Sequence, residues 1–198
     1  MKEFSDERLA EGLKQKSFEC FEELVHRYGT PLYRFINQMV KDEGESQDLT
    51  QETFLRVYQH IDRYDPQYPF KVWLYSIAGN LAINVLHSAR RKRLLFFWNR
   101  LDQRGEYLLP SEDEIMDNHH NPEEALSDRQ THDRVRRAID RLHPRQKMAL
   151  TLNKIEGLSY QEIARTMNIT LSAVESLIFR AKQRIHRELK EKERGNLF

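Results

Sequence analysis

The stretch SYQEIARTMNITLSAVESLIFRAKQRI, residues 159–185, contains two helical patterns of apolar residues separated by a short polar break. Each pattern opens with a serine followed three residues later by a glutamate, as Ser159 with Glu162 and Ser172 with Glu175. That spacing is typical of a capping box, in which both side chains satisfy free backbone N–H groups at a helix start. The second helix is expected to begin near Thr170 or Ser172. Two such helices joined by a turn of about three or four residues predict a helix-turn-helix.

In a helix-turn-helix, the second helix enters the major groove of duplex DNA while the first braces it across the backbone. Glu175 either closes the capping box with Ser172, which we favour, or accepts a hydrogen bond from cytosine N4. The buried face is predicted to comprise Ile163, Ala164, Met167, Ile169, Val174, Leu177 or Ile178, and Ala181. The outward positions predicted to contact bases are Ser172, Glu175, Ser176, Phe179 and Arg180. Those predicted to contact phosphates are Lys182, Arg184 and Arg187.

The formal net charge of +1 conceals a strong alternation of sign along the chain. Residues 129–198 carry 16 basic and 8 acidic side chains, whereas residues 105–128 carry 8 acidic side chains and no Lys or Arg. A polyanion senses the local field within a Debye length, which is about 10 Å at 0.1 M salt. An ordinary helical hairpin with solvated basic residues would also explain this charge. The tight turn and the two caps favour DNA binding.

The chain has 198 residues, of which 39% are hydrophobic and 32% are charged, with only 7 Gly and 6 Pro. This composition favours a helical protein with a small hydrophobic core. No apolar stretch approaches the roughly 20 residues of a membrane span, and the N-terminus lacks the apolar segment of a signal peptide. We therefore expect a cytoplasmic protein. Cys20 is the only cysteine, which excludes an internal disulfide and favours a buried thiol.

We predict an all-α fold of two small helical domains, residues 1–93 and 129–198, joined by an acidic flexible linker at 94–128. Helices are expected at 5–14 and 17–28, with Ser5 and Ser17 as N-caps, and from Pro31 onward. Further helices are expected from about Ser46 to Asp62 and, after a loop at DPQYP (65–69), from Phe70 to 93. In the second domain, they are expected at 129–142 and 144–155, with Gly157 as a stop. Gly79, inside a predicted helix, indicates close packing. We expect no cofactor and no metal site, because the adjacent His119 and His120 lack any zinc motif.

Two further patterns lie in the first domain. The stretch 70–93 places aromatic and amide side chains ahead of a basic cluster, a combination suited to unpaired bases and backbone phosphates. Its candidate residues are Trp73, Tyr75, Asn80, Asn84, Arg90, Arg91, Lys92 and Arg93, although a core role is the default for Trp73. The stretch DLTQETFLRVY, residues 48–58, places Asp48 and Glu52 one helical turn apart, which taken alone indicates a solvated face.

In this order, the three segments closely resemble an extracytoplasmic-function (ECF, group 4) sigma factor of bacterial RNA polymerase. DLTQETFLRVY resembles region 2.2, WLYSIAGNLAINVLHSARRKR resembles regions 2.3 and 2.4, and residues 139–185 resemble region 4. The resemblance implies an alternative, non-enzymatic sigma factor that binds core RNA polymerase and promoter DNA and is held by an anti-sigma factor. It implies minus-ten capture and melting by the residues of 73–93 named above, and minus-thirty-five recognition by the second helix of the helix-turn-helix. It assigns core-polymerase binding to Asp48, Leu49, Gln51, Glu52 and Leu55.

The main alternative is a conventional helix-turn-helix regulator whose N-terminal bundle senses a ligand or dimerises. A nuclease or phosphotransferase fits poorly, because the sequence has no P-loop, zinc motif or evident catalytic constellation. Asp48 and Glu52 are too few ligands for a convincing magnesium site.

Overall fold

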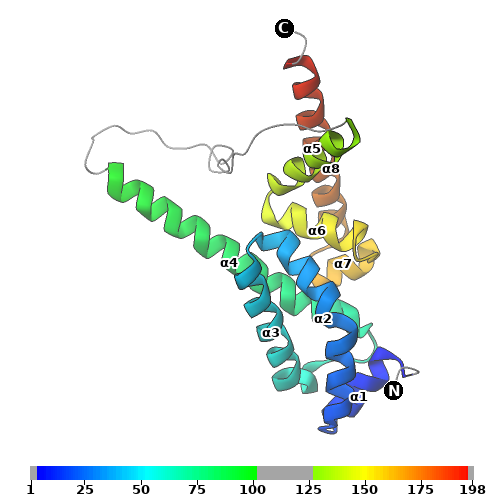
Figure 1. The fold of residues 1–198 in the computed structure, drawn as a ribbon. Helices are drawn as coiled ribbons and strands as arrows, with labels where there is room; N and C mark the ends of the chain where they lie inside the picture. The colour runs from blue at the N-terminus through cyan, green and yellow to red at the C-terminus, as the bar shows by residue number, and fades with distance from the viewer. Residues whose placement is uncertain (1–3, 102–126, 196–198) are drawn as a thin grey trace.

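The computed structural model describes residues 4–101 and 127–195, with side chains described for 4–88 and 134–190. All regular elements in these ranges are helices, which confirms the all-α prediction. The first bundle contains α1 (Asp6–Lys14), α2 (Phe18–Val40), α3 (Glu43–His60), the 3-10 turn η1 (Ile61–Arg63) and the start of α4 (Phe70–Leu101). The second contains α5 (Ser127–Asp140), α6 (Pro144–Lys154), α7 (Tyr160–Thr166) and α8 (Leu171–Gly195). Figure 1 shows α4 passing beneath α6 and α7 and then extending away from both bundles.

Helix α2 corrects the sequence prediction, because one continuous helix replaces the two expected on either side of Pro31. Proline inside a helix costs about 3 kcal/mol relative to alanine. The apolar stripe runs past it without a break: Leu24, Leu32 and Phe35 are all fully buried. Each such side chain contributes about 1.5–3 kcal/mol on burial, so packing on both sides of Pro31 offsets the defect.

Helix α4 begins at Phe70 as predicted but ends at Leu101, beyond residue 93, where we expected the linker to begin. The apolar periodicity weakens after Leu94, and that change alone suggested the end of the helix. No Gly or Pro occurs between Gly79 and Gly105, so the chain has no local reason to break there. The acidic segment 105–126 lies outside the described residues.

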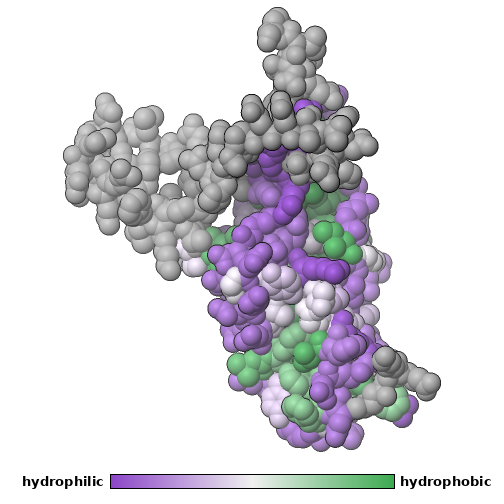
Figure 2. All heavy atoms as spheres, viewed as in Figure 1, coloured by the Kyte–Doolittle hydropathy of each residue, from purple (hydrophilic) through white to green (hydrophobic). Residues whose placement is uncertain are grey.

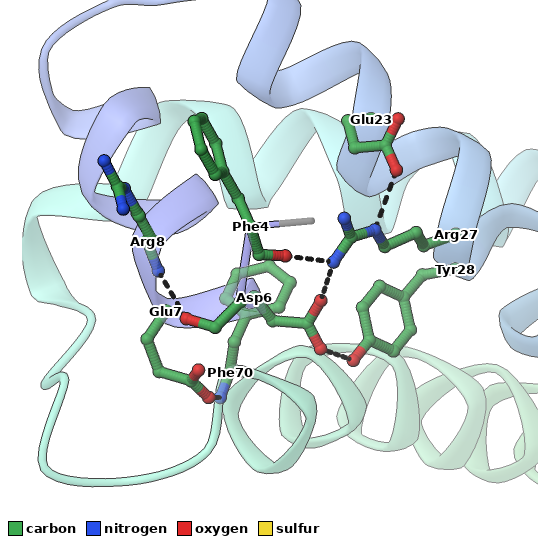
Figure 3. Close-up of polar contacts among 9 residues, drawn as sticks. Phe4, Asp6, Glu7, Arg8, Glu23, Arg27, Tyr28 and Phe70 are labelled. Carbon is green, nitrogen blue, oxygen red and sulfur yellow. Dashed lines mark hydrogen bonds and ion pairs between the residues drawn. The ribbon is translucent and has the colours of Figure 1, made fainter. Parts of the chain in front are cut away.

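An ionic network fixes α1 to α2 (Figure 3). Arg27 of α2 donates hydrogen bonds to the Asp6 carboxylate at 2.9 Å, to the Phe4 carbonyl at 2.8 Å and to Glu23 at 2.8 Å. The Tyr28 hydroxyl donates to the second Asp6 oxygen. Ser5 caps α1 by accepting a hydrogen bond from the backbone of Arg8, as the sequence predicted. The N-terminal helix is therefore held in place by charge-assisted hydrogen bonds as well as by its buried leucines.

The two bundles share one continuous apolar core, which lies between α4 of the first and α6 and α7 of the second. Gly79 of α4 faces Met148 of α6 so closely that a Cβ on Gly79 would lie 2.0 Å from the methionine Cε. This confirms the close packing predicted at Gly79. Polar contacts lie beside the core: Lys41, which follows α2, lies 3.1 Å from Asp140, and Asp140 also contacts the buried Lys147 at 2.9 Å.

Candidate polymerase and nucleic-acid interfaces

The predicted helix-turn-helix is present as α7 and α8. The Ser159–Glu162 capping box is confirmed: Ser159 N–H donates to the Glu162 carboxylate at 2.7 Å, and Glu162 N–H donates to Ser159 Oγ at 3.3 Å. Asn168 takes a left-handed backbone conformation, with φ of 50°, in the turn between the helices. A left-handed residue reverses the chain direction after a helix, so α8 starts within a few residues.

The predicted capping box of Ser172 with Glu175 is wrong. Helix α8 begins at Leu171, and its cap is Thr170, whose hydroxyl accepts a hydrogen bond from Ala173 N–H at 3.2 Å. Ser172 therefore lies inside the first turn, where its backbone is already helical. Sequence reasoning weighed both starts, and the serine–glutamate spacing favoured the wrong one. Glu175 is left as an exposed carboxylate on the outer face of α8.

The two faces of α7 and α8 largely follow the prediction. Of the residues predicted to be buried, Ile163, Met167, Val174, Ile178 and Ala181 are buried. Leu177 is only partly buried, so Ile178 is the core residue of the two. The exposed positions include Ser172, Glu175, Ser176, Phe179, Arg180, Lys182 and Arg187. Arg184 is half-buried instead, with its guanidinium 3.6 Å from Glu188.

A shallow hollow of about 430 Å³ lies on this outer face, lined by Tyr160, Glu175, Ser176, Ile178, Phe179 and Lys182. Phe179 is 61% exposed beside it. Tyr160 was not predicted as a site residue, because its position inside the first helix of the motif gave no signal. The hollow thus combines an acid, a base and aromatic surface on the face predicted to meet DNA.

The residues of α3 predicted to bind the polymerase are at least partly exposed, with one exception. Asp48 and Gln51 are exposed, Leu55 is 49% exposed, and Glu52 is partly exposed and paired with Arg56 at 2.7 Å. Leu49 is only 7% exposed and belongs to the core between α2, α3 and α4. It lies one residue from Asp48, and adjacent residues on a helix point in different directions.

Exposed apolar residues near this face were not predicted. Phe18 at the start of α2 is 66% exposed, and Tyr58 of α3 is 40% exposed. Phe21 bridges them, with ring centroids 6.4 Å from Phe18 and 5.4 Å from Tyr58. Figure 2 shows hydrophobic side chains gathered at the end of the molecule formed by α1, α2 and α3. An aromatic patch therefore adjoins the acidic face of α3.

The residues of α4 that were predicted to capture unpaired bases differ in their exposure to solvent. Asn80 and Asn84 are exposed, one turn apart. Tyr75 is fully buried, and its hydroxyl donates a 2.5 Å hydrogen bond to Glu156, so the prediction of an accessible ring is wrong for this arrangement. Trp73 is partly buried, and its ring packs against Tyr64 and Phe70 at the edge of the core. The side chains of the basic cluster at 90–93 lie outside the described residues, although their backbone is helical.

Glu156 was missed by sequence reasoning. It follows α6, and its carboxylate accepts from Tyr75 and lies 3.5 Å from Lys71 Nζ, which also donates to the Glu156 carbonyl at 2.6 Å. Burial and the Glu156 hydrogen bond raise the pKa of the Tyr75 hydroxyl well above its ordinary value. The partners are about 80 residues apart in sequence, a separation that local pattern cannot connect.

The described ranges contain neither a metal-binding cluster nor a membrane-spanning helix. No group of three or more His, Cys, Asp or Glu side chains there is arranged to hold a metal ion. His119 and His120 lie outside those ranges. Of the helices described, none has both the length and the apolar character to cross a membrane.

Comparisons with known proteins agree with this geometry. The family model for sigma-70 region 2 matches residues 24–92, and the model for sigma-70 region 4 matches residues 132–185. RNA polymerase sigma-H factor of Pseudomonas aeruginosa is 31% identical over 184 residues, 93% of each chain.

The chain belongs to the sigma-70 family of RNA polymerase sigma factors.

Within this family, it is similar to factors of the ECF group. ECF RNA polymerase sigma factor SigE of Mycolicibacterium smegmatis is 32% identical over 86% of this chain, which spans 62% of the length of that relative. A solved structure of the sigma factor RpoE with the anti-sigma factor NepR from Bartonella quintana has a TM-score of 0.56 and 21% identity. It covers 86% of this chain and 96% of its own. That likeness supports the fold of two helical bundles.

Proposed function

We propose that this ECF sigma factor binds core RNA polymerase and directs promoter-specific initiation through two separate DNA contacts. The observation that carries the proposal is the pairing of an exposed amide face on α4 with a correctly formed helix-turn-helix in α7 and α8. The first suits unpaired bases, and the second suits duplex DNA. Neither face has the catalytic groups of an enzyme, so the proposed activity is promoter recognition and strand separation as part of the assembled RNA polymerase.

The proposed polymerase-binding surface is the exposed face of α3 with Asp48, Gln51, Glu52 and Leu55. Two of these residues are acidic, one is polar, and Leu55 supplies apolar area at their edge. Acidic residues beside exposed apolar area fit a partner helix with basic and apolar side chains, since interfaces combine apolar contacts with a polar rim. Leu49 supports this face from beneath and does not contact the polymerase directly.

The proposed minus-ten contact uses Asn80 and Asn84 to hydrogen-bond the edges of unpaired bases, with the basic segment 90–93 on the phosphates. Unstacking a base costs a few kcal/mol, which such contacts offset. Trp73 supports the helix from the core side. Tyr75 joins the DNA contact only if the turn that carries Glu156 moves away from α4.

The proposed minus-thirty-five contact is the outer face of α8. Ser172, Glu175, Ser176, Phe179 and Arg180 lie toward base edges, and Lys182, Arg187 and Arg184 lie toward phosphates. Neutralised phosphates release counterions, so this contact weakens steeply as salt rises.

We also propose that an anti-sigma factor binds this chain and holds it inactive. The support is family membership together with the similar fold of RpoE, which was solved with the anti-sigma factor NepR. Cytoplasmic location follows from the same proposal, because core polymerase is the partner.

Run-off transcription tests the function against the alternative of a conventional helix-turn-helix regulator. Purified chain is added to core polymerase lacking other sigma factors, with genomic fragments as template. The proposal expects discrete transcripts that depend on the chain. A regulator would bind duplex DNA by itself and leave core polymerase without promoter-dependent transcripts, an outcome that overturns the proposal.

A further inference from the structure

The outer face of α8 contains one acidic residue among the groups that face DNA. Glu175 is exposed, and within the described residues it makes no hydrogen bond or ion pair. Thr170 caps the start of α8, so Glu175 does not take part in a capping box. Its carboxylate is therefore not required to hold the helix start.

A free carboxylate is costly on a surface that approaches DNA. Duplex DNA carries one negative charge per about 1.7 Å of its axis, so an unpaired carboxylate reduces affinity for every sequence. That penalty is relieved where the carboxylate accepts a hydrogen bond from the DNA itself. In the major groove, the exocyclic donors are cytosine N4 and adenine N6, and glutamate pairs with cytosine N4.

The surroundings of Glu175 suit such a contact. It lines the hollow together with Phe179 and Lys182, which follow it at one and two helical turns on the same face of α8. Lys182 can hold a phosphate at the edge of the hollow, and the Phe179 ring can shield one side of the carboxylate from water once DNA covers this face. A hydrogen bond to a charged acceptor is stronger where water is excluded.

We propose that Glu175 is a specificity-determining residue that selects a cytosine in the duplex element contacted by α8. The inference rests on the proposed function, since it assigns one base to the minus-thirty-five contact. A thymine at that position would present its O4 acceptor to the carboxylate, and two acceptors repel. Discrimination of about 5- to 100-fold against the other bases is expected for one good side-chain contact.

The test uses the full chain assembled with core polymerase. A promoter duplex library randomised across the upstream element is selected with wild type, with Glu175→Ala and with Gln183→Ala, an exposed control on the same helix that does not line the hollow. Circular dichroism melting of each variant confirms folding. The affinities of the four bases at each position are then compared.

The expected result is one position at which wild type and Gln183→Ala prefer cytosine and Glu175→Ala shows no preference. The inference is overturned if Glu175→Ala binds all sequences more tightly by the same factor, since Glu175 then only repels phosphates. It is also overturned if the lost preference is for another base, or if no preference changes. Failure of wild type to select any sequence would instead count against the proposed function.

Discussion

The hydroxyl of Tyr75 donates a 2.5 Å hydrogen bond to the carboxylate of Glu156, which joins the second turn of α4 to the turn after α6. Tyr75 is fully buried, and the Glu156 side chain is 8% exposed. Lys71 lies 3.5 Å from the same carboxylate and balances its charge. This cluster is a polar contact between α4 and the second bundle.

Tyr75→Phe is expected to lower the free energy of unfolding by about 1.5–3 kcal/mol, because a buried charged acceptor loses a donor. Urea unfolding followed by circular dichroism measures the change. Tyr33→Phe is the control: Tyr33 is half-buried, and we expect a change within about 0.5 kcal/mol. Adding Glu156→Gln to Tyr75→Phe should cost less than the sum of the two single changes. Strict additivity would contradict the contact.

Gly79→Ala should destabilise the chain even though alanine favours a helix. A Cβ there would lie 2.0 Å from Met148 Cε and 2.9 Å from its sulfur, and Met148 is itself only 1% exposed. We expect a loss of about 1–3 kcal/mol from overpacking. Gly29→Ala in α2 is the matched control: its Cβ would meet nothing within 4 Å, so it should stabilise by about 0.5–1 kcal/mol.

The double variant Gly79→Ala with Met148→Ala separates overpacking from other effects. Removing the methionine side chain creates room for the new methyl group, so the pair should be more stable than the sum of the single changes predicts. Thermal unfolding of wild type, the two single variants and the double variant gives the coupling free energy between the two positions. A Gly79→Ala variant as stable as Gly29→Ala would show that α4 and α6 do not pack as described.

The capping box of α7 should make stability depend on pH. The Ser159 hydroxyl, and next its backbone N–H, lower the pKa of Glu162 below its ordinary 4.5. The folded state therefore favours the ionised form, and its stabilisation is present above pH 4.5 and lost as pH falls through the lowered pKa. Melting of wild type and Glu162→Gln from pH 7 to pH 3 should show a stability difference that shrinks below about 4.5. A constant difference would contradict the assignment.

Replacing Asp48 and Glu52 by arginine should weaken binding to core polymerase, because it reverses the charge of the exposed face of α3. A binding titration with labelled chain measures the effect, and we expect at least a tenfold loss, about 1.4 kcal/mol. The control variant Glu11→Arg with Asp65→Arg makes the same charge change at exposed positions outside α3. An equal loss in both variants would indicate a general charge effect instead of a docking surface.

Local signals predicted much of this fold. The Ser5, Ser17 and Ser159 caps, the loop before Phe70 and the stop at Gly157 all follow from residues within one helical turn of the feature. Errors arose where distant packing outweighs local preference. Buried side chains on both sides of Pro31 hold α2 together, whereas the sequence prediction gave the proline more weight than this apolar stripe.

The candidate interfaces were predictable in part for the same reason. Exposure of Asn80, Asn84, Ser176 and Phe179 follows from helical period alone. Tyr75 is buried against Phe35 of α2, and its hydroxyl is bonded to Glu156, which the fold brings from the second bundle. The sequence allowed α8 to be capped by Thr170 or by Ser172, and only the folded backbone shows that Thr170 is the cap.

The central claim is that α4 holds separated strand while α8 holds duplex, and a crossed template experiment tests it most directly. Asn80→Ala with Asn84→Ala, and separately Phe179→Ala with Arg180→Ala, are assayed with core polymerase on a fully paired promoter and on one already unpaired at the minus-ten element. The account predicts that the unpaired template restores more activity to the α4 variant than to the α8 variant. Equal restoration of both variants, or of neither, would contradict it.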